Sequence, residues 1–477
     1  MKQEMTPIIS IPDRILKAAL AWPDLPAILT AEKIISYKML AHGILSAQER
    51  LAQLGLPKGQ LLAIEVTDPA RHLILALAAM RLGVPTVSLS RGSSGAKDLR
   101  CVAVLADDVD PTHDSPVFVI DPSWFAGQPA SGIWVEASPA TLCRVSYTSG
   151  STGDAKPTAM TQTTLWNRIE SRLAASVSHA GRTLVLPTLT TNFGFTRSIM
   201  PLVQGEAIVF AQQYEDAVRL IELYSVESLV GSPSQLVAVL ETLDTCPSST
   251  ASLRMVKSGG GPLWGSLIEK LRQKLCSNIV DVYSSTEGGP AGVAAGHLLA
   301  KRSECLSFLP ITQIRCIASP ESESEGVGAI EIFSQSRAVA YMPAQPFVAP
   351  EPGWVRTGDL GRISEDGELQ LLGRDGHILN AGGRKFNSEM MQEFLIAQTG
   401  IHDAGIVTSG EESHGTEVWL ALACEDTLDI TAICARMSEA FNGFAPDRIV
   451  RFARLPRTTL GKLETATLRN MISQTLR

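Results

Sequence analysis

Short apolar runs alternate with amphipathic segments along the first part of the chain. Apolar residues at three- and four-residue intervals predict helices at Asp13–Ala21, Tyr37–Leu54 and Pro69–Leu82. The continuous apolar runs Leu61–Val66 and Thr86–Leu89 predict buried strands. Because strand, helix and strand follow one another at the spacing of a βαβ unit, the pattern predicts a largely parallel sheet covered by helices.

The same alternation continues through the middle of the chain. Two more helices are expected, at Glu215–Tyr224 and Leu263–Leu275. Further short apolar runs predict strands at Val102–Leu105, Val117–Ile120, Thr183–Leu186, Ala207–Phe210, Ser228–Val230 and Met255–Ser258. The predicted fold class is therefore α/β, with a large N-terminal body of mostly parallel or mixed sheets and helices.

A change of pattern near Gly373–Gly376 indicates a domain boundary. It follows a strand candidate, Gly328–Ser334, and a hairpin-like stretch, Ile363–Leu372, that contains a Glu-Asp-Gly turn. We expect a large domain at residues 1–372 and a small, mobile α+β C-terminal domain at residues 373–477. The C-terminal part has its own helix–strand alternation, at Ser388–Thr399, Asp403–Val407, Glu417–Ala423 and Thr431–Phe441.

Composition narrows the class of protein. Of the 477 residues, 45% are hydrophobic and 19% are charged, and 41 Lys+Arg against 49 Asp+Glu give a net charge of −8. This acidic balance disfavours nucleic acid or an anionic membrane as a partner, because both need a basic surface. The longest apolar stretches, such as Leu73–Met80, are far shorter than the ~20 residues of a membrane span.

The N-terminus and the cysteines favour a cytoplasmic protein. Met1–Asp13 contains two acidic residues and lacks the apolar core of a signal peptide. The eight cysteines form no Cys-x-x-Cys pair, so we expect neither a zinc site nor a disulfide framework.

The strongest local signal is a segment rich in Ser, Thr and Gly at residues 148–156. Glycines let the backbone turn its N–H groups toward an anion, hydroxyls add donors, and a lysine adds a point charge. The segment predicts a phosphate-holding loop, although for such a run in isolation a flexible polar turn is an equal alternative. It is not a P-loop, because Lys156 follows Ala155 and precedes Pro157. The candidate binding residues are Thr148, Ser149, Gly150, Ser151, Thr152, Gly153 and Lys156.

Three later segments add compatible chemistry. At the end of an apolar run, Tyr283 could stack on a base, Thr286 could touch a phosphate and Glu287 could bind Mg²⁺. Asp359 ends a Trp-Val-Arg-Thr-Gly-Asp segment and is suited to accept hydrogen bonds from ribose hydroxyls. Lys462 follows a turn near the C-terminus. Each of these residues alone has an ordinary alternative, such as a capping aspartate or a solvated lysine.

In this order and spacing the motifs resemble those of the adenylate-forming superfamily, which comprises acyl-CoA synthetases, adenylation domains of peptide synthetases and luciferases. The resemblance extends from about Ala27 to Leu468. Two weaker segments agree with it, since Val256–Leu263 resembles the glycine-rich adenine loop and Gly373–Lys385 resembles the hinge. The glycines of the adenine loop are Gly259, Gly260 and Gly261.

The resemblance implies a two-step reaction. A carboxylate attacks the α-phosphate of ATP, which gives an acyl-adenylate and pyrophosphate. The small domain then rotates, and the thiol of CoA or of a carrier-protein phosphopantetheine takes the acyl group and releases AMP. The implied cofactors and partners are ATP, Mg²⁺, a small carboxylic acid, and CoA or an acyl carrier protein.

The resemblance also implies the roles of single residues. These are phosphate binding by Lys156 and the hydroxyls before it, adenine stacking by Tyr283, contact with the α-phosphate by Thr286, Mg²⁺ binding by Glu287, ribose binding by Asp359 with Arg374 nearby, and bridging of the carboxylate and α-phosphate by Lys462. Negative charge gathers on the phosphorus oxygens in the transition state, and an ammonium group and Mg²⁺ neutralise it.

The chain departs from the family pattern at the hinge and in the acid-binding segment. Gly376 stands where Asp or Lys is usual, so the identity of the hinge residue stays open. Asn192, Gly194 and Thr196 occupy the positions where a carboxylate would pair with a substrate ammonium group. An α-amino acid is therefore disfavoured, because a buried ammonium group without a partner is costly. The particular acid stays open.

Two classes of function remain. One is an AMP-forming acid–thiol ligase, and the other is a non-catalytic relative that binds a nucleotide or a partner protein. Lys156, Glu287, Asp359 and Lys462 are all present, which favours the enzyme. A luciferase-like oxidation of the adenylate is a third and weaker alternative. CoA is slightly favoured over a carrier protein, because the sequence contains no fused carrier domain.

Overall fold

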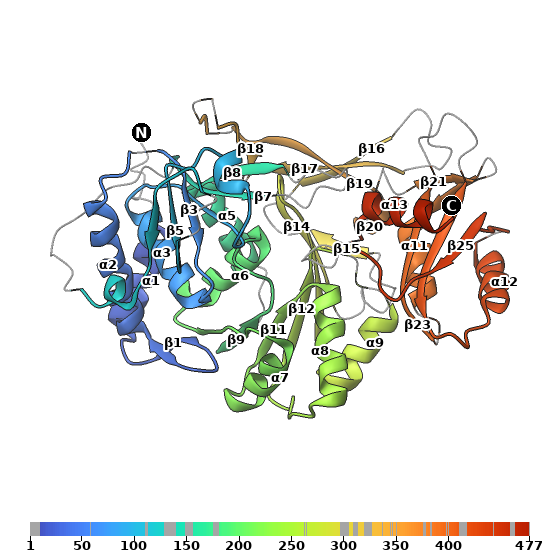
Figure 1. Ribbon diagram of the computed structural model, residues 1–477, viewed down its shortest axis with the longest axis horizontal. Helices are drawn as coiled ribbons and strands as arrows, with labels where there is room; N and C mark the ends of the chain where they lie inside the picture. Colours follow the sequence, from blue (N-terminus) through green and yellow to red (C-terminus); the bar gives the residue numbers. More distant parts are fainter. Residues whose placement is uncertain are drawn as a thin grey trace.

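The computed structural model is elongated, with the N-terminal elements at one end and the C-terminal elements at the other (Figure 1). The structure describes residues 10–57, 59–109, 113–127, 140–147, 156–174, 181–261, 263, 265–295, 305–308, 313–318, 327–335, 337–343, 345, 347–349, 351–374, 378–381, 384–396, 398, 400–409, 417–441, 443–457 and 463–476.

The N-terminal part contains a sheet with a parallel centre. In spatial order, its strands within the described residues are β18 (Val339–Ala340), β8 (Pro157–Thr161), β7 (Leu142–Tyr147), β4 (Thr86–Ser88), β3 (Leu62–Glu65), β5 (Ala103–Ala106) and β6 (Val117–Val119). The strands from β7 to β6 pair in parallel, whereas β8 and β18 are antiparallel additions at one edge.

A second, longer sheet has a parallel half and an antiparallel half. In spatial order its strands, as far as the chain is described, are β16 (Gln313–Ala318), β17 (Gly328–Ser334), β19 (Gly353–Ile363), β20 (Leu369–Arg374), β15 (Cys305–Phe308), β14 (Gly289–Ala295), β13 (Ile279–Ser285), β12 (Met255–Gly259), β11 (Ser228–Gly231), β9 (Arg182–Val185), β10 (Ala207–Val209), β1 (Pro26–Leu29) and β2 (Ile34–Ser36). The strands from β13 to β1 pair in parallel, and those from β13 to β16 pair antiparallel.

Helices cover both sheets, and side chains at their first turns set where they begin. The helices of this part are α1 (Ile11–Ala21), α2 (Tyr37–Gln53), α3 (Pro69–Arg81), α4 (Gly95–Asp98), a 3₁₀ turn η1 (Pro122–Phe125), α5 (Gln162–Ala174), α6 (Asn192–Val203), α7 (Tyr214–Leu223), α8 (Pro233–Thr245) and α9 (Gly265–Lys274). Asp68 caps α3, and Ser232 forms a capping box with Gln235 at the start of α8.

Two large apolar cores follow from this layering. One joins α1, α2, α3 and α6 with the parallel sheet, and includes Ile44, Leu77 and Phe195. The other lies between the long sheet and α7, α8 and α9, which lie side by side along β11 and β12 in Figure 1. Since α6 contributes to the first core and faces the second sheet through Phe193, it lies where the two sheets approach each other.

The C-terminal part forms its own small α/β arrangement at the far end of the molecule (Figure 1). Its elements are β21 (Ile378–Ala381), β22 (Arg384–Asn387), α11 (Ser388–Ile396), β23 (Ile401–Thr408), β24 (Val418–Cys424), α12 (Ile430–Ala440), β25 (Arg448–Arg451) and α13 (Thr465–Thr475). Leu395, Leu420 and Ile433 are buried in its core. The domain boundary at residue 372 stays a prediction.

The predicted fold class, α/β with parallel and mixed sheets, is confirmed.

Two elements differ from the prediction. Helix α1 begins at Ile11, two residues before the predicted start, because Ser10 caps it and accepts a hydrogen bond from the Asp13 amide. The antiparallel strand β14 was not predicted, since its sequence, Gly-Pro-Ala-Gly-Val-Ala-Ala, has a single β-branched residue. In the part of the chain that is described, every helix is too short or too polar to cross a membrane.

Gly194 in α6 allows close backbone packing that an alanine would prevent. A Cβ atom on this residue would lie 2.2 Å from the carbonyl oxygen of Thr188 and 2.4 Å from that of Pro187. We expect Gly194→Ala to lower the free energy of unfolding by about 3 kcal/mol in urea titrations. Gly261→Ala is the control, because its Cβ would lie 3.7 Å from Pro233, an ordinary contact. Equal stability of the two variants would contradict the tight packing at Gly194.

Candidate active site

The parallel pair β12 and β13 brings two predicted motifs to one edge of the long sheet. Gly259, at the end of β12, lies opposite Val282 of β13. The carboxyl ends of parallel strands meet at the same edge, so Gly260 and Gly261 lie beside the region of Tyr283. Gly260 has a φ of 88°, a conformation that favours glycine. The structure therefore brings the predicted adenine loop and the predicted stacking ring together.

Tyr283 is also joined to the predicted ribose residue. Its hydroxyl donates a 2.6 Å hydrogen bond to Oδ2 of Asp359, although the two residues are 76 positions apart. The Asp359 amide donates to Thr357 Oγ1 at 3.1 Å, which holds the turn around the carboxylate. Across β19 and β20, Asp359 lies opposite the backbone of Arg374. Two residues predicted to bind the nucleoside, Tyr283 and Asp359, thus meet, and the backbone of Arg374 lies beside them.

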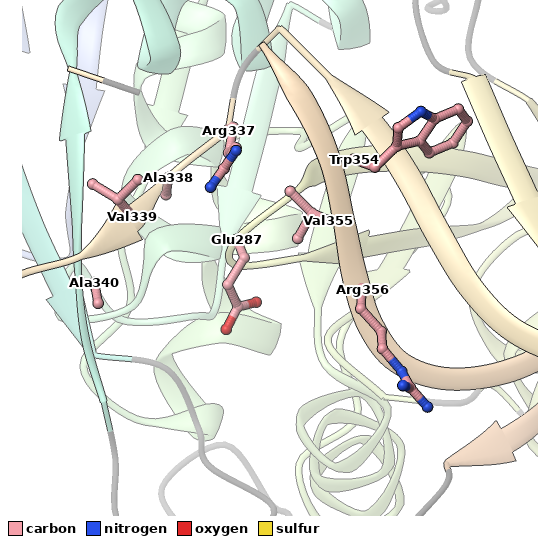
Figure 2. A pocket seen from close by; sticks show the side chains of 8 residues that line it. All are labelled: Glu287, Arg337, Ala338, Val339, Ala340, Trp354, Val355 and Arg356. Carbon is pink, nitrogen blue, oxygen red and sulfur yellow. The ribbon is translucent and has the colours of Figure 1, made fainter. Parts of the chain in front are cut away.

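Glu287 lines an open pocket of about 490 Å³ next to this group. The pocket is bounded by the end of β13, by the segment around β18 and by β19 (Figure 2). Figure 2 shows Glu287, Arg337 and Arg356 around it, with the indole of Trp354 turned away from Glu287. The turn that carries Thr286 and Glu287 is held by the Gly288 amide, which donates to Ser285 Oγ at 2.7 Å.

These pocket residues fit a metal-bound polyphosphate. Mg²⁺ in nucleotide sites is held by one or two carboxylates and by the phosphates themselves, so the single carboxylate of Glu287 is a sufficient protein ligand. Two guanidinium groups beside it suit phosphate oxygens, because arginine presents a planar fork of donors. The charged side chains of this pocket are therefore suited to phosphate chemistry.

A buried arginine supports Glu287 from behind. Nη2 of Arg168, in α5, donates a 3.1 Å hydrogen bond to the backbone carbonyl of Glu287, and the amide of Ala338 donates to the same oxygen at 2.7 Å. Burial lowers the pKa of Arg168 to about 10, while the Glu287 carboxylate opposes that shift. The arginine still carries its charge at neutral pH, and it fixes the backbone of the predicted metal ligand.

The predicted phosphate loop joins two neighbouring antiparallel strands. Strand β7 ends at Tyr147 and β8 begins at Pro157, with Ser146 opposite Thr158. Lys156 is exposed at the start of β8. Thr158 also pairs with Ala340 of β18, which lines the Glu287 pocket, so the loop is anchored next to that pocket. The loop residues Thr148, Ser149, Gly150, Ser151, Thr152 and Gly153 lie outside the described residues.

The predicted catalytic lysine, Lys462, lies between two described residues that pair with each other. Lys462 lies outside the described residues, but Arg457 and Leu463 on either side form an isolated β-bridge. The guanidinium of Arg457 also donates two hydrogen bonds to the Asp403 carboxylate, at 2.8 and 2.5 Å. Arg457, just before the undescribed residues 458–462, is therefore tied to β23.

Two cations lie near the glycine loop, one on α6, which carries the segment predicted to bind the acid, and one on β12. Arg197 in α6 is 5% exposed, and burial lowers its pKa to about 10. Lys257 in β12 is partly buried, and its pKa falls to about 8 because of burial and of the Arg197 charge, against the opposing charge of Glu206. The predicted acid-binding segments therefore carry positive charge.

Sequence reasoning missed Arg197, Arg168 and Arg337. The segment considered for acid binding ended at Thr196, one residue before Arg197. The sequence did contain a signal for Arg197. This residue follows Phe193 by four positions, so the two side chains lie on the same face of a helix. Arg168 gave no signal, because its contact with Glu287 depends on how α5 packs.

The chain is similar in sequence and in fold to known enzymes. The family described as AMP-binding enzyme matches residues 15–317. The 2-succinylbenzoate–CoA ligase of Bacillus pumilus is 22% identical over 489 residues, covering 96% of this chain and 98% of that protein. The corresponding ligase of Bacillus cytotoxicus is 24% identical over 422 residues, covering 85% of this chain and 87% of that one.

Solved structures show the same fold. The o-succinylbenzoate CoA synthetase of Bacillus subtilis, in complex with its acyl-adenylate intermediate, superposes with a TM-score of 0.82 at 21% identity, over 97% of this chain and 98% of that chain. An amide bond synthetase from Marinactinospora thermotolerans gives a TM-score of 0.79 at 19% identity, over 97% of this chain and 99% of that one.

The family match and the relatives define an adenylate-forming enzyme. The chain belongs to the AMP-binding enzyme family. The predicted activity class, an AMP-forming acid–thiol ligase that first adenylates a carboxylic acid, is confirmed by the family and by the relatives.

The lowered pKa of Lys257 makes stability depend on pH. Below pH 8 the amine is charged in the folded and unfolded states, and the folded state bears the full cost of burying that charge. Between about 8 and 10.5 the folded state has lost this proton while the unfolded state keeps it, so stability rises with pH. We expect wild type to gain about 2 kcal/mol relative to Lys257→Met across this range.

Urea titrations of both proteins at about pH 7.5 and pH 10 measure this difference, because other titrating groups cancel in the comparison. Lys270→Met, at an exposed position of α9, is the control and should show no such pH dependence. If the difference in free energy of unfolding between wild type and Lys257→Met stays constant with pH, the Lys257 amine is solvated in the folded protein.

Proposed function

We propose that this enzyme activates a carboxylic acid with Mg²⁺ and ATP and transfers the acyl group to CoA, using the residues assigned below. The observation that carries the proposal is the hydrogen bond between Tyr283 and Asp359 beside the glycine loop. The phenol ring of Tyr283 can stack on adenine beside the glycine loop, and the carboxylate of Asp359 can accept hydrogen bonds from the ribose hydroxyls.

The phosphates extend from this nucleoside site into the Glu287 pocket. Glu287 holds Mg²⁺, Thr286 contacts the α-phosphate, and Arg337 and Arg356 face the leaving pyrophosphate. The loop at residues 148–153 and Lys156 close the phosphate chain from β7 and β8, since β18 joins these strands to the pocket. Lys462 supplies the last positive charge in the adenylating arrangement.

The thiol acceptor is CoA, and the relatives support this choice. The three Bacillus relatives described above are CoA ligases or CoA synthetases, and the chain spans nearly the full length of the Bacillus pumilus protein. The acid named for these relatives, 2-succinylbenzoate, is the first candidate substrate. Pyrophosphate release with a panel of carboxylic acids, with and without CoA, tests the proposal. Thioester formed with a carrier protein and never with CoA would overturn the assignment of the acceptor.

Removal of the Glu287 carboxylate tests the metal assignment. We expect Glu287→Ala to slow adenylation by about a hundredfold or more, because the metal-bound phosphates lose their protein anchor. The protein should stay folded, since the Glu287 carbonyl keeps its bonds to Arg168 and Ala338. Steady-state pyrophosphate release over a Mg²⁺ titration measures the loss. Glu365→Ala, in the exposed β19–β20 turn, is the control. Near-wild-type adenylation by Glu287→Ala would remove this residue from the metal site.

Lys462 separates the two half-reactions. We expect Lys462→Ala to slow acyl-adenylate formation by about a hundredfold or more, since it removes a positioned charge from the transition state. Thioester formation from supplied acyl-AMP should survive, because rotation of the small domain has by then moved the lysine away. Gly382→Leu should do the reverse, by blocking thiol entry while sparing pyrophosphate exchange. Equal loss in both steps for Lys462→Ala would contradict the rotation.

A further inference from the structure

Lys257 and Arg197 come from facing elements. Lys257 and Gly259 are two residues apart in β12, so they share one face of that strand. The ring of Phe193 lies against this face, since a Cβ atom on Gly259 would be 3.0 Å from its Cζ atom. Phe193 and Arg197 are four residues apart in α6 and share one face of the helix. The two side chains therefore project from the facing sides of β12 and α6, where the charge of Arg197 acts on Lys257.

The guanidinium of Arg197 is poorly satisfied there. Within the described residues, its polar contact is Nη1 to the sulfur of Met200 at 3.8 Å, and its carbon Cζ lies 5.3 Å from the centre of the Phe193 ring. Nε has no hydrogen-bond partner among the described atoms. A guanidinium has five N–H donors, and a buried charge without an acceptor is costly. Arg197 therefore has a donor left for an acceptor on a ligand.

The surroundings increase this excess of positive charge. Arg172 of α5 is 6% exposed, and its Nε also lacks a partner in the described part of the chain. Burial lowers the pKa of Arg172, and the charges of Arg197 and Arg168 lower it further. Two carboxylates oppose the lowering of these pKa values: Glu206 raises the pKa of Lys257, and Glu287 raises that of Arg168. The balance stays positive, so a bound anion would be stabilised.

The position of the pair relates it to the acid substrate. Gly259 leads directly into the glycine loop beside Tyr283, which marks the nucleotide end of β12. Lys257 lies two residues back, about 7 Å further along the strand. An acid with its reacting carboxylate at the nucleotide would extend along α6 and β12 toward Lys257 and Arg197.

We propose that Lys257 and Arg197 bind a second anionic group of the acid, so that the enzyme selects dianionic carboxylic acids whose two charged groups are separated by about 7 Å or somewhat more. This inference rests on the proposed function. It also agrees with Asn192, Gly194 and Thr196 in α6, which provide no carboxylate for an ammonium group.

Matched pairs of acids test this selection. The pairs are pimelate and heptanoate, terephthalate and benzoate, and 2-succinylbenzoate and benzoylpropionate, which differ within each pair by one carboxylate. We expect kcat/KM for adenylation to favour the dianionic member of at least one pair by about thirtyfold or more. A ratio near one in every pair in which acids are adenylated would overturn the inference and leave the proposed function standing.

Substitution of the lysine assigns the preference to this site. Lys257→Met should reduce the dianion-to-monoanion ratio by about tenfold or more, mainly through KM for the acid, while KM for ATP changes little. Lys270→Met, exposed in α9, is the matched control and should keep the wild-type ratio. Equal losses for both members of a pair would show that Lys257 is structural, and an unchanged ratio would place the selection elsewhere. Either result would overturn the inference.

A binding measurement covers the case in which the proposed function fails. The preferred dicarboxylate, added without ATP, should raise the melting temperature of wild type and of Lys270→Met but not that of Lys257→Met. If no acid of the panel is adenylated, the proposed function is contradicted, and this shift still decides whether the anion site exists. The absence of a shift with every dicarboxylate would overturn the site.

Discussion

The parallel pairing of β12 and β13 is the constraint on which the site depends. Gly259 must lie opposite Val282 for the glycine loop to reach Tyr283, and the same register turns Lys257 toward α6. A shift by one residue would move every side chain of β12 to the other face of the sheet. Lys257 would then point toward the apolar core under α8 and α9, and the nucleotide edge and the acid side would both be lost.

The antiparallel half of the long sheet serves a different purpose. Strand β19 returns past β17 and carries Asp359 to Tyr283, and its first residues line the pocket of Glu287. The parallel half carries the glycine loop after β12, and the antiparallel half carries Asp359 and the pocket residues of β19. This division explains why residues far apart in the sequence meet at one edge.

Much of this arrangement could be predicted from the sequence, and the rest depends on packing. The βαβ alternation predicted the parallel strands because buried strands are continuous apolar runs. Tyr283 and Asp359 could be assigned to one nucleoside from their motifs, although nothing in the sequence indicates the hydrogen bond between them. Arg168 could not be found, because its role follows from the contact of α5 with the turn after β13. Strand β14 was missed because small residues carry little strand signal.

The bond from Arg168 to the backbone of Glu287 has a consequence for the order of events. A guanidinium behind the carboxylate, with Arg337 and Arg356 around the pocket, leaves the region cationic before any ligand arrives. A bare divalent ion is repelled by such a field, whereas a magnesium–nucleotide complex with net negative charge is attracted. We therefore expect the metal to enter as part of its nucleotide complex, so that metal affinity measured without ATP understates how tightly the working enzyme holds it.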